Sequence, residues 1–163
     1  DSGTFLVRRT TRLKTNADLA GKKIAVFKDS TTDKALREVI LTQALAGGRV
    51  STEIVLVKDR QEGMTALESG AVDALAGDRT ILASFARGAS DPDKFALAEY
   101  QFLYEPYGLP LRRNDADFKY AVNSVLASLY HSGEVLKISR RWFGDLPTSP
   151  LLESLYDLNG LRD

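Results

Sequence analysis

Cysteine is absent from this chain of 163 residues, and histidine occurs once, at His131. Without cysteine the chain has no disulfide, no thiol nucleophile and no cysteine-ligated metal site. A lone histidine also excludes a metal site with two histidine ligands, and a Ser-His-Asp hydrolase would have to use His131. A helix is predicted to end beside it at Gly133, where a cation is favourable, so we expect His131 to have no catalytic role.

Net charge is absent too, because 22 lysines and arginines balance 22 aspartates and glutamates. A nucleic-acid-binding protein usually shows a basic excess or stripe, and a polybasic membrane-surface module is disfavoured for the same reason. The sequence has no apolar run of about 18 residues, so no transmembrane helix is expected. Apolar residues make up 44% of the chain and charged residues 27%, which allows one ordinary domain with a buried core.

Short motifs for phosphate and cofactor binding are missing as well. The sequence contains neither a GxxxxGK phosphate loop nor a GxGxxG dinucleotide motif. The pairs Arg112-Arg113 and Arg140-Arg141 are too short to form nucleic-acid-binding patches. We therefore expect no cofactor, no metal ion and no nucleic-acid partner.

What the sequence does contain is a regular alternation of short apolar runs and amphipathic segments. Strands are expected at Thr4–Arg9, Lys23–Phe27, Val50–Val57, Ala71–Ala76, Phe95–Tyr100 and Tyr107–Arg112. Helices are expected to begin near Ser30, Asp59, Asp78 and Asp117 and after Gly133, with glycines ending them. This alternation predicts an α/β fold with an open, doubly wound sheet and helices on both faces, and it disfavours all-α and all-β folds.

Polar residues follow three of the predicted strands, at the sheet edge where open α/β proteins bind ligands. Ser30, Thr31 and Thr32 would place hydroxyls and N–H groups at a helix N-terminus, which suits a carboxylate or phosphate, and one of them also caps the helix. Asp78 could hold an ammonium group or act as a helix cap. Arg60 could grip a carboxylate or lie solvated at the surface. Together these groups would suit a zwitterion with an acidic side chain.

Five segments of the chain follow one another in a characteristic order and spacing. They are NADLAGKKIAV, STTDKAL, ALESGAVDALAGDRTIL, YGLPLRRNDADFKYAVN and SGEVLKISRRWFG. In this order they resemble the bacterial extracellular solute-binding proteins of the polar amino-acid family, which have the type II periplasmic-binding-protein fold. The likeness runs from about Thr4 to Gly144 and is strongest to glutamate- and aspartate-binding proteins.

The family has two α/β lobes joined by two hinge strands, with the ligand between the lobes. The resemblance implies a first hinge strand at residues 1–9, a second ligand-binding lobe at 10–106, a second hinge strand at 107–112 and C-terminal helices at 113–163 that would pack on the first lobe. Tyr107 and Gly108 match the second hinge. Most of the first lobe is expected to be missing, including the arginine that usually clamps the ligand α-carboxylate. The Asp-Ser-Gly start agrees with a processed product, an expression product or a fragment.

The resemblance also assigns roles to the polar groups. Ser30, Thr31 and Thr32 match the hydroxyl-rich loop that donates to the ligand carboxylate, and Asp78 matches the aspartate that accepts the α-ammonium. Arg60 stands where glutamate/aspartate binders carry a histidine, so it either holds an acidic side chain more strongly or marks a different ligand. Asp29 stands where the loop often has glycine, and a negative charge beside a carboxylate site is unfavourable.

The function implied by the resemblance is the substrate-binding component of an amino-acid ABC importer in the periplasm. It would close its lobes around a polar or acidic amino acid and then dock on permease subunits in the inner membrane. No bond is made or broken, so we expect no enzyme. Two alternatives stay open: an enzyme of the cyclohexadienyl dehydratase type on the same fold, and a ligand-sensing module of a larger receptor.

Without the first lobe, the C-terminal helices would leave four apolar side chains partly exposed: Phe118, Val122, Leu129 and Trp142. An exposed apolar patch of this kind promotes association. We therefore expect either self-association, by swapping of the C-terminal helices, or a packed-back arrangement.

Overall fold

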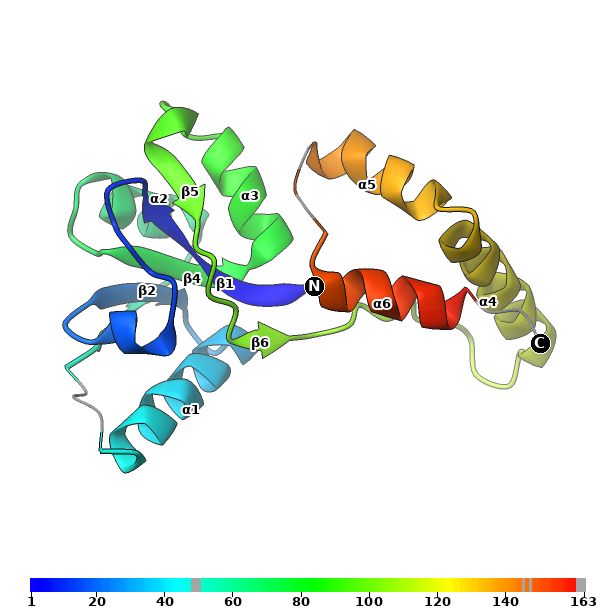
Figure 1. The fold of residues 1–163 in the computed structure, drawn as a ribbon, viewed down its shortest axis with the longest axis horizontal. Coiled ribbons are helices and arrows are strands. Elements are labelled where there is room, and N and C mark those ends of the chain that lie inside the picture. Colours follow the sequence, from blue (N-terminus) through cyan, green and yellow to red (C-terminus); the bar gives the residue numbers. More distant parts are fainter. Residues whose placement is uncertain (48–50, 145, 147, 161–163) are drawn as a thin grey trace. The chain divides into compact units, whose positions relative to one another are not determined.

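The chain forms two compact units in the computed structural model, which describes residues 1–47, 51–144, 146 and 148–160. Unit 1 comprises Asp1–Pro106 and unit 2 comprises Tyr107–Asp163. Unit 1 contains the β-sheet and the helices that cover it, whereas unit 2 is helical (Figure 1).

A mixed, open sheet forms the centre of unit 1 (Figure 1). Its strands are β1 (Ser2–Arg8), β2 (Lys23–Phe27), β3 (Glu53–Val57), β4 (Ala74–Asp78), β5 (Phe95–Leu97) and β6 (Leu103–Tyr104). The strand order is β3-β2-β4-β1-β5, and β6 also pairs with β1. Strand β2 runs parallel to β3 and β4, whereas β1 runs antiparallel to β4, β5 and β6. The carboxyl ends of β2, β3 and β4 therefore meet at one edge of the sheet.

Helices cover both faces of this sheet, as the sequence predicts (Figure 1). They are η1 (Asn16–Leu19), α1 (Thr31–Leu45), α2 (Arg60–Glu68), α3 (Arg79–Arg87) and η2 (Pro92–Lys94). Leu6 of β1 and Leu75 of β4 pack with the side chains of α2 and α3. Their strand neighbours, such as Phe5 and Ala76, point the other way and pack with Leu36 of α1. Successive residues of a strand face opposite sides, so each strand contributes to two apolar cores.

A short turn before β2 is ordered by one carboxylate. Asp18 Oδ2 accepts hydrogen bonds from the backbone N–H groups of Lys14 and Thr15, each at 2.9 Å, and from the Thr15 hydroxyl at 3.2 Å. The two backbone hydrogen bonds favour the charged carboxylate and lower the pKa of Asp18 below its ordinary value. This turn leads the chain from β1 into β2, and Leu19 at its end is fully buried.

Unit 2 consists of α4 (Ala116–His131), α5 (Glu134–Phe143) and α6 (Pro150–Asn159). Helix α4 ends beside Gly133, whose φ of +71° places it in the left-handed region that glycine adopts readily. The rings of Tyr130 in α4 and Tyr156 in α6 stack with centroids 4.9 Å apart. Burial and the neighbouring Tyr130 raise the pKa of Tyr156.

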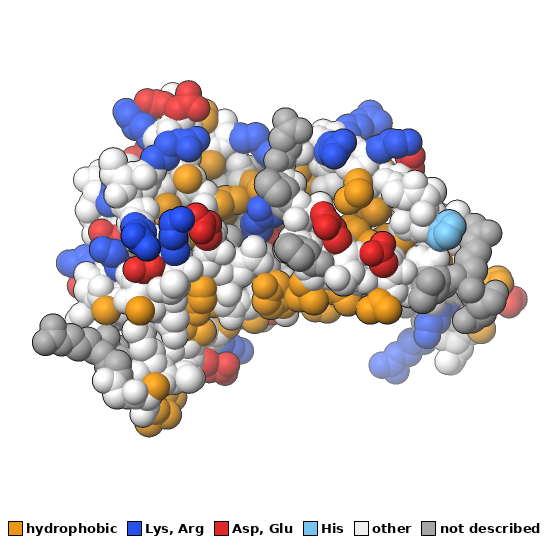
Figure 2. All heavy atoms as spheres, in the orientation of Figure 1, with side chains coloured by type: hydrophobic (Ala, Val, Ile, Leu, Met, Phe, Trp, Pro, Cys, Tyr) orange, Lys and Arg blue, Asp and Glu red, His pale blue; other side chains and the backbone are white. Residues whose placement is uncertain are grey.

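Apolar side chains remain exposed on the helices of unit 2 (Figure 2). The exposed fraction is 51% for Phe118 and 70% for Trp142, while Val122 and Leu129 are half-buried. The four apolar side chains are therefore at least partly exposed, as expected from the sequence.

Among the residues that the structure describes, the segment Tyr107–Arg112, expected as a strand, forms no ladder with another strand. Pro106 and Pro110 flank or interrupt it, and a proline lacks the N–H that a ladder requires. The expectation of regular strand pairing there was wrong. The role of Tyr107 and Gly108 as a hinge stays a prediction.

Other strand boundaries also differ from expectation. The strand expected at Phe95–Tyr100 ends at Leu97, and the chain pairs with β1 again at β6. Strand β4 ends at Asp78 rather than Ala76, so Asp78 is the last residue of a strand as well as the residue before α3. The expected start of a strand at Val50 lies outside the described residues.

Candidate functional site

The edge of the sheet at the carboxyl ends of β2 and β4 brings two of the predicted polar groups together. Val26 of β2 is in register with Ala76 of β4. The two strands are parallel neighbours, so the residues after Phe27 and the end of β4 at Asp78 lie at the same edge of the sheet. The loop that follows Lys28 leads into α1, so the N-terminus of α1 and the carboxylate of Asp78 share one edge of the sheet.

Ser30 is the N-cap of α1. Its Oγ accepts a hydrogen bond from the Asp33 N–H at 3.1 Å and donates one to the Phe27 carbonyl at 2.7 Å. The single proton of this hydroxyl is therefore directed to Phe27. Ser30 is therefore the residue of the Ser30–Thr32 group that caps the helix.

Asp29 precedes this cap with a φ of +61°, in the left-handed region. Glycine adopts this conformation at least cost, and aspartate is among the few other residues that tolerate it. The backbone at this position therefore suits glycine or aspartate.

Thr31 and Thr32 are the first two residues of α1. Their N–H groups lie in the first helical turn, which has no earlier carbonyl of the helix to bond. Thr31 is exposed and its hydroxyl donates to Glu105 Oε2 at 3.1 Å, whereas Thr32 is only 4% exposed. The helix N-terminus and the Thr31 hydroxyl together favour a carboxylate at this position.

Asp78 occupies the N-cap position of α3, but its side chain makes no capping hydrogen bond. The Thr80 N–H in the first turn of α3 is bonded instead by Asp1, the residue before β1: Asp1 Oδ2 accepts from the Thr80 N–H at 3.3 Å and from the Thr80 hydroxyl. Arg79 follows Asp78, and burial lowers the pKa of its guanidinium. Asp78 therefore stands at the end of β4 and does not cap α3 through its side chain.

Arg60 begins α2 at the same edge of the sheet, but its guanidinium lies on α3. The Cζ atom is 4.6 Å from the ring centroid of Phe85, a cation–π contact. A Cβ at Gly88 would collide with this guanidinium, so the glycine makes room for it. The Arg60 side chain thus lines a surface hollow of about 420 Å³ with residues of α2 and α3, and Thr31 and Asp78 are not among its lining residues.

Two carboxylates at this edge were missed by the sequence analysis. Asp1 and Glu105 lie about a hundred residues apart in the chain, yet they are neighbours across β1 and β6. No local pattern could have found them, because their places depend on the pairing of Ser2 with Tyr104. They contact Thr80 and Thr31 respectively, at the N-termini of α3 and α1.

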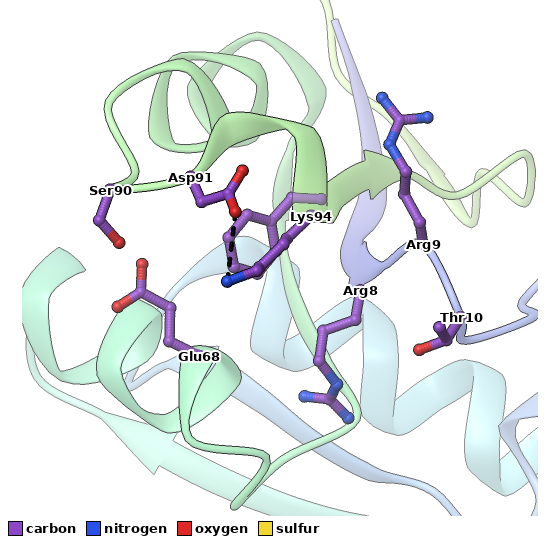
Figure 3. Close-up of a pocket in the computed structure, with 8 residues that line it drawn as sticks. Arg8, Arg9, Thr10, Glu68, Ser90, Asp91 and Lys94 are labelled. Atoms are coloured by element: carbon purple, nitrogen blue, oxygen red, sulfur yellow. Dashed lines mark ion pairs between the residues drawn. The ribbon is translucent and has the colours of Figure 1, made fainter.

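A second hollow, of about 430 Å³, lies at the other end of β1 (Figure 3). Lys94 and Asp91 form an ion pair there, with Lys94 Nζ 3.2 Å from the carboxylate. Arg8 donates to the carbonyls of Leu67 at 2.6 Å and Val72 at 2.8 Å. Because β1 and β4 are antiparallel, this hollow is at the sheet edge opposite Asp78, and the Arg8 guanidinium serves to tie the end of α2 to the sheet.

Metal binding and membrane insertion find no support among the residues that the structure describes. Within them, no cluster of three or more histidine, aspartate or glutamate side chains is placed to hold a metal ion. None of the helices in the same residues is both long and apolar enough to cross a membrane.

Comparison with known proteins identifies relatives along most of the chain, although no protein-family model matches. The L-glutamate/L-aspartate-binding protein of Pseudomonas aeruginosa is 30% identical over 155 residues, which are 95% of this chain and 48% of that protein. The glutamate/aspartate import solute-binding protein of Salmonella typhimurium is 29% identical over 85% of this chain and 44% of its own length. The chain is a homologue of the bacterial solute-binding proteins for polar amino acids. It spans about half the length of the curated relatives it matches.

Solved structures of ligand-binding domains share the fold. The second substrate-binding domain of GlnP from Lactococcus lactis superposes with a TM-score of 0.69 at 21% identity, over 87% of this chain and 58% of that one. The GluR0 ligand-binding core in complex with L-glutamate gives a TM-score of 0.67 at 21% identity, over 88% and 60%. The relatives are binding proteins by name, which agrees with a role in binding rather than catalysis.

Proposed function

We propose that the chain is the ligand-binding lobe of the solute-binding component of an amino-acid ABC importer. The proposal is supported by the topology, because the α1 N-terminus and Asp78 follow the neighbouring parallel strands β2 and β4 at one edge of the sheet. An amino acid has a carboxylate for the first and an ammonium group for the second. The relatives named above bind or import glutamate and aspartate, which makes an acidic or polar amino acid the expected ligand.

In the proposed complex the ligand α-carboxylate accepts hydrogen bonds from the N–H groups of Thr31 and Thr32 and from the Thr31 hydroxyl. Asp78 accepts from the α-ammonium. Ser30 acts through its cap, because its hydroxyl proton goes to Phe27. Arg60 would reach the ligand side chain only by leaving the ring of Phe85.

In the proposed domain organisation, residues 10–106 form the second lobe, and residues 1–9 and 107–112 form the crossings to a first lobe. Strand β1 of the first crossing also pairs within the sheet of unit 1, whereas residues 107–112 belong to unit 2. The helices at 113–163 pack on that lobe, which covers the apolar side chains that unit 2 exposes, or else they pair with a second copy of the chain. The protein then acts in the periplasm and delivers its ligand to permease subunits of the inner membrane.

Calorimetric titration of the full product of the reading frame that contains this chain tests the proposal. L-Glutamate, L-aspartate, L-glutamine and L-cystine are the ligands to compare. Asp78→Asn removes the charge that would hold the ammonium, and we expect about ten- to hundredfold weaker binding, the range for losing a charge-assisted hydrogen bond.

Asp59→Asn is the matched control. Asp59 caps the neighbouring helix α2 through the Glu62 N–H at 2.9 Å, and asparagine caps as well as aspartate does. The control should bind like the wild type. Wild-type affinity in Asp78→Asn would refute the ammonium contact, and no binding of any of the four amino acids by the wild type would refute the proposed function.

A further inference from the structure

The paired ends of β1 and β6 carry two carboxylates. The Asp1 nitrogen donates to the Glu105 carbonyl at 2.8 Å, and the Glu105 N–H donates to the Asp1 carbonyl at 3.1 Å. Their side chains diverge to two helices: Asp1 binds Thr80 in the first turn of α3, and Glu105 binds Thr31 at the first residue of α1. The helices that follow β2 and β4, α1 and α3, thus each have a carboxylate from the ends of β1 and β6 at their N-terminus.

The contact between Glu105 and Thr31 involves the same donor that the proposed ligand needs. A threonine hydroxyl has one proton and donates one hydrogen bond at a time. In the structure that bond goes to Glu105 Oε2 at 3.1 Å. Thr31 is exposed and Glu105 is half-buried, so a ligand carboxylate can reach the hydroxyl from solvent. Two carboxylates at one donor also repel each other, so only one of them is favoured there.

We propose that Glu105 is an internal competitor of the ligand carboxylate and sets the affinity of the site. The inference rests on the proposed function, in which the ligand carboxylate binds Thr31. When the ligand arrives, the Thr31 hydroxyl turns from Glu105 to the ligand, and the Glu105 side chain leaves α1. The affinity measured for the ligand is lower by the free energy of the contact that it replaces.

The position of Glu105 gives this exchange a second consequence. Glu105 directly follows β6 and precedes Pro106, the last residue of unit 1. The Thr31 contact therefore ties the segment that leaves unit 1 to the helix that receives the ligand. Ligand binding releases this side-chain contact, while the two backbone hydrogen bonds between Glu105 and Asp1 remain.

Variants of Glu105 separate this competition from other effects of the side chain. Glu105→Ala removes the acceptor, and Glu105→Asp keeps the charge but shortens the side chain by one methylene, so that it no longer reaches Thr31. We expect both to bind L-glutamate about three- to tenfold more tightly than the wild type, the gain for one exposed charge-assisted hydrogen bond. The gain should vanish in a Thr31→Val background.

Glu99→Ala is the matched control. Its carboxylate pairs with Lys14 Nζ at 2.6 Å on the same side of β1, so it removes one negative charge from the same part of the chain without touching Thr31. The control should bind L-glutamate like the wild type. The measurement is the dissociation constant from calorimetry, on the full product of the reading frame.

The outcomes distinguish this inference from the proposed function. If the wild type binds L-glutamate and Glu105→Ala binds it equally or more weakly, the competition is refuted while the proposed function stands. If Glu105→Ala tightens binding but Glu105→Asp does not, charge repulsion rather than the Thr31 hydroxyl is responsible, and the competition is again refuted. If neither the wild type nor the variants bind, the proposed function falls and the inference falls with it.

Discussion

Replacing Ser30 by alanine separates helix capping from ligand binding. The substitution removes the acceptor of the Asp33 N–H, 3.1 Å away, and the donor to the Phe27 carbonyl, 2.7 Å away. The Phe27 carbonyl keeps a weaker bond at 3.4 Å from the Ser30 N–H. The main loss is therefore the cap, which costs about 1 kcal/mol of the free energy of unfolding. For a unit of this size that loss corresponds to a fall in melting temperature of about 4–8 °C.

The assay combines thermal unfolding with amide hydrogen exchange at Asp33, whose N–H loses its partner. Ser30→Asn is the matched control, because asparagine also caps a helix, and it should restore most of the stability. We expect Ser30→Ala to change ligand affinity less than Thr31→Val does, since the Ser30 proton is already bound to Phe27. An unchanged melting temperature together with unchanged exchange at Asp33 would refute the capping argument.

Three further predictions concern the stability of unit 1. Asp18→Asn should lower the melting temperature at pH 7. Hydrogen bonds lower the pKa of Asp18 from 3.8, so the stabilisation by its carboxylate is fully present above pH 3.8 and is lost as the pH falls below that value. The melting temperatures of the two proteins should therefore converge in acid. Leu36→Ala removes a fully buried side chain and should cost about 2–5 kcal/mol in urea unfolding, whereas Leu41→Ala, at a position 59% exposed, should cost under about 0.5 kcal/mol. Arg8→Met removes the Arg8 donor from the carbonyls of Leu67 and Val72, although the Leu67 carbonyl still accepts from the Gly70 N–H at 3.3 Å. The substitution should cost about 1 kcal/mol, and equal urea midpoints for it and the wild type would contradict that role.

Much of unit 1 could be predicted from local patterns. The apolar runs at Lys23–Phe27 and Val50–Val57 and the cap residues Ser30 and Asp59 mark β2, β3 and the starts of α1 and α2, because strand pairing and helix capping need those residue types at those places. The position of Ser30–Thr32 and Asp78 at strand ends also follows from the sequence. Pairing along Tyr107–Arg112 was not predicted correctly, since a ladder depends on a partner strand and on N–H groups that proline lacks.

The sequence alone thus determined the layers of the fold and the candidate residues at the ends of its strands, because periodicity, caps and turns are properties of neighbouring residues. The tertiary structure alone decided which side chains meet. It placed β1 antiparallel between β4 and β5, turned Arg60 onto Phe85, and brought Glu105 to Thr31. These contacts depend on strand register and helix packing across most of the length of unit 1, and no local pattern in a single sequence encodes them.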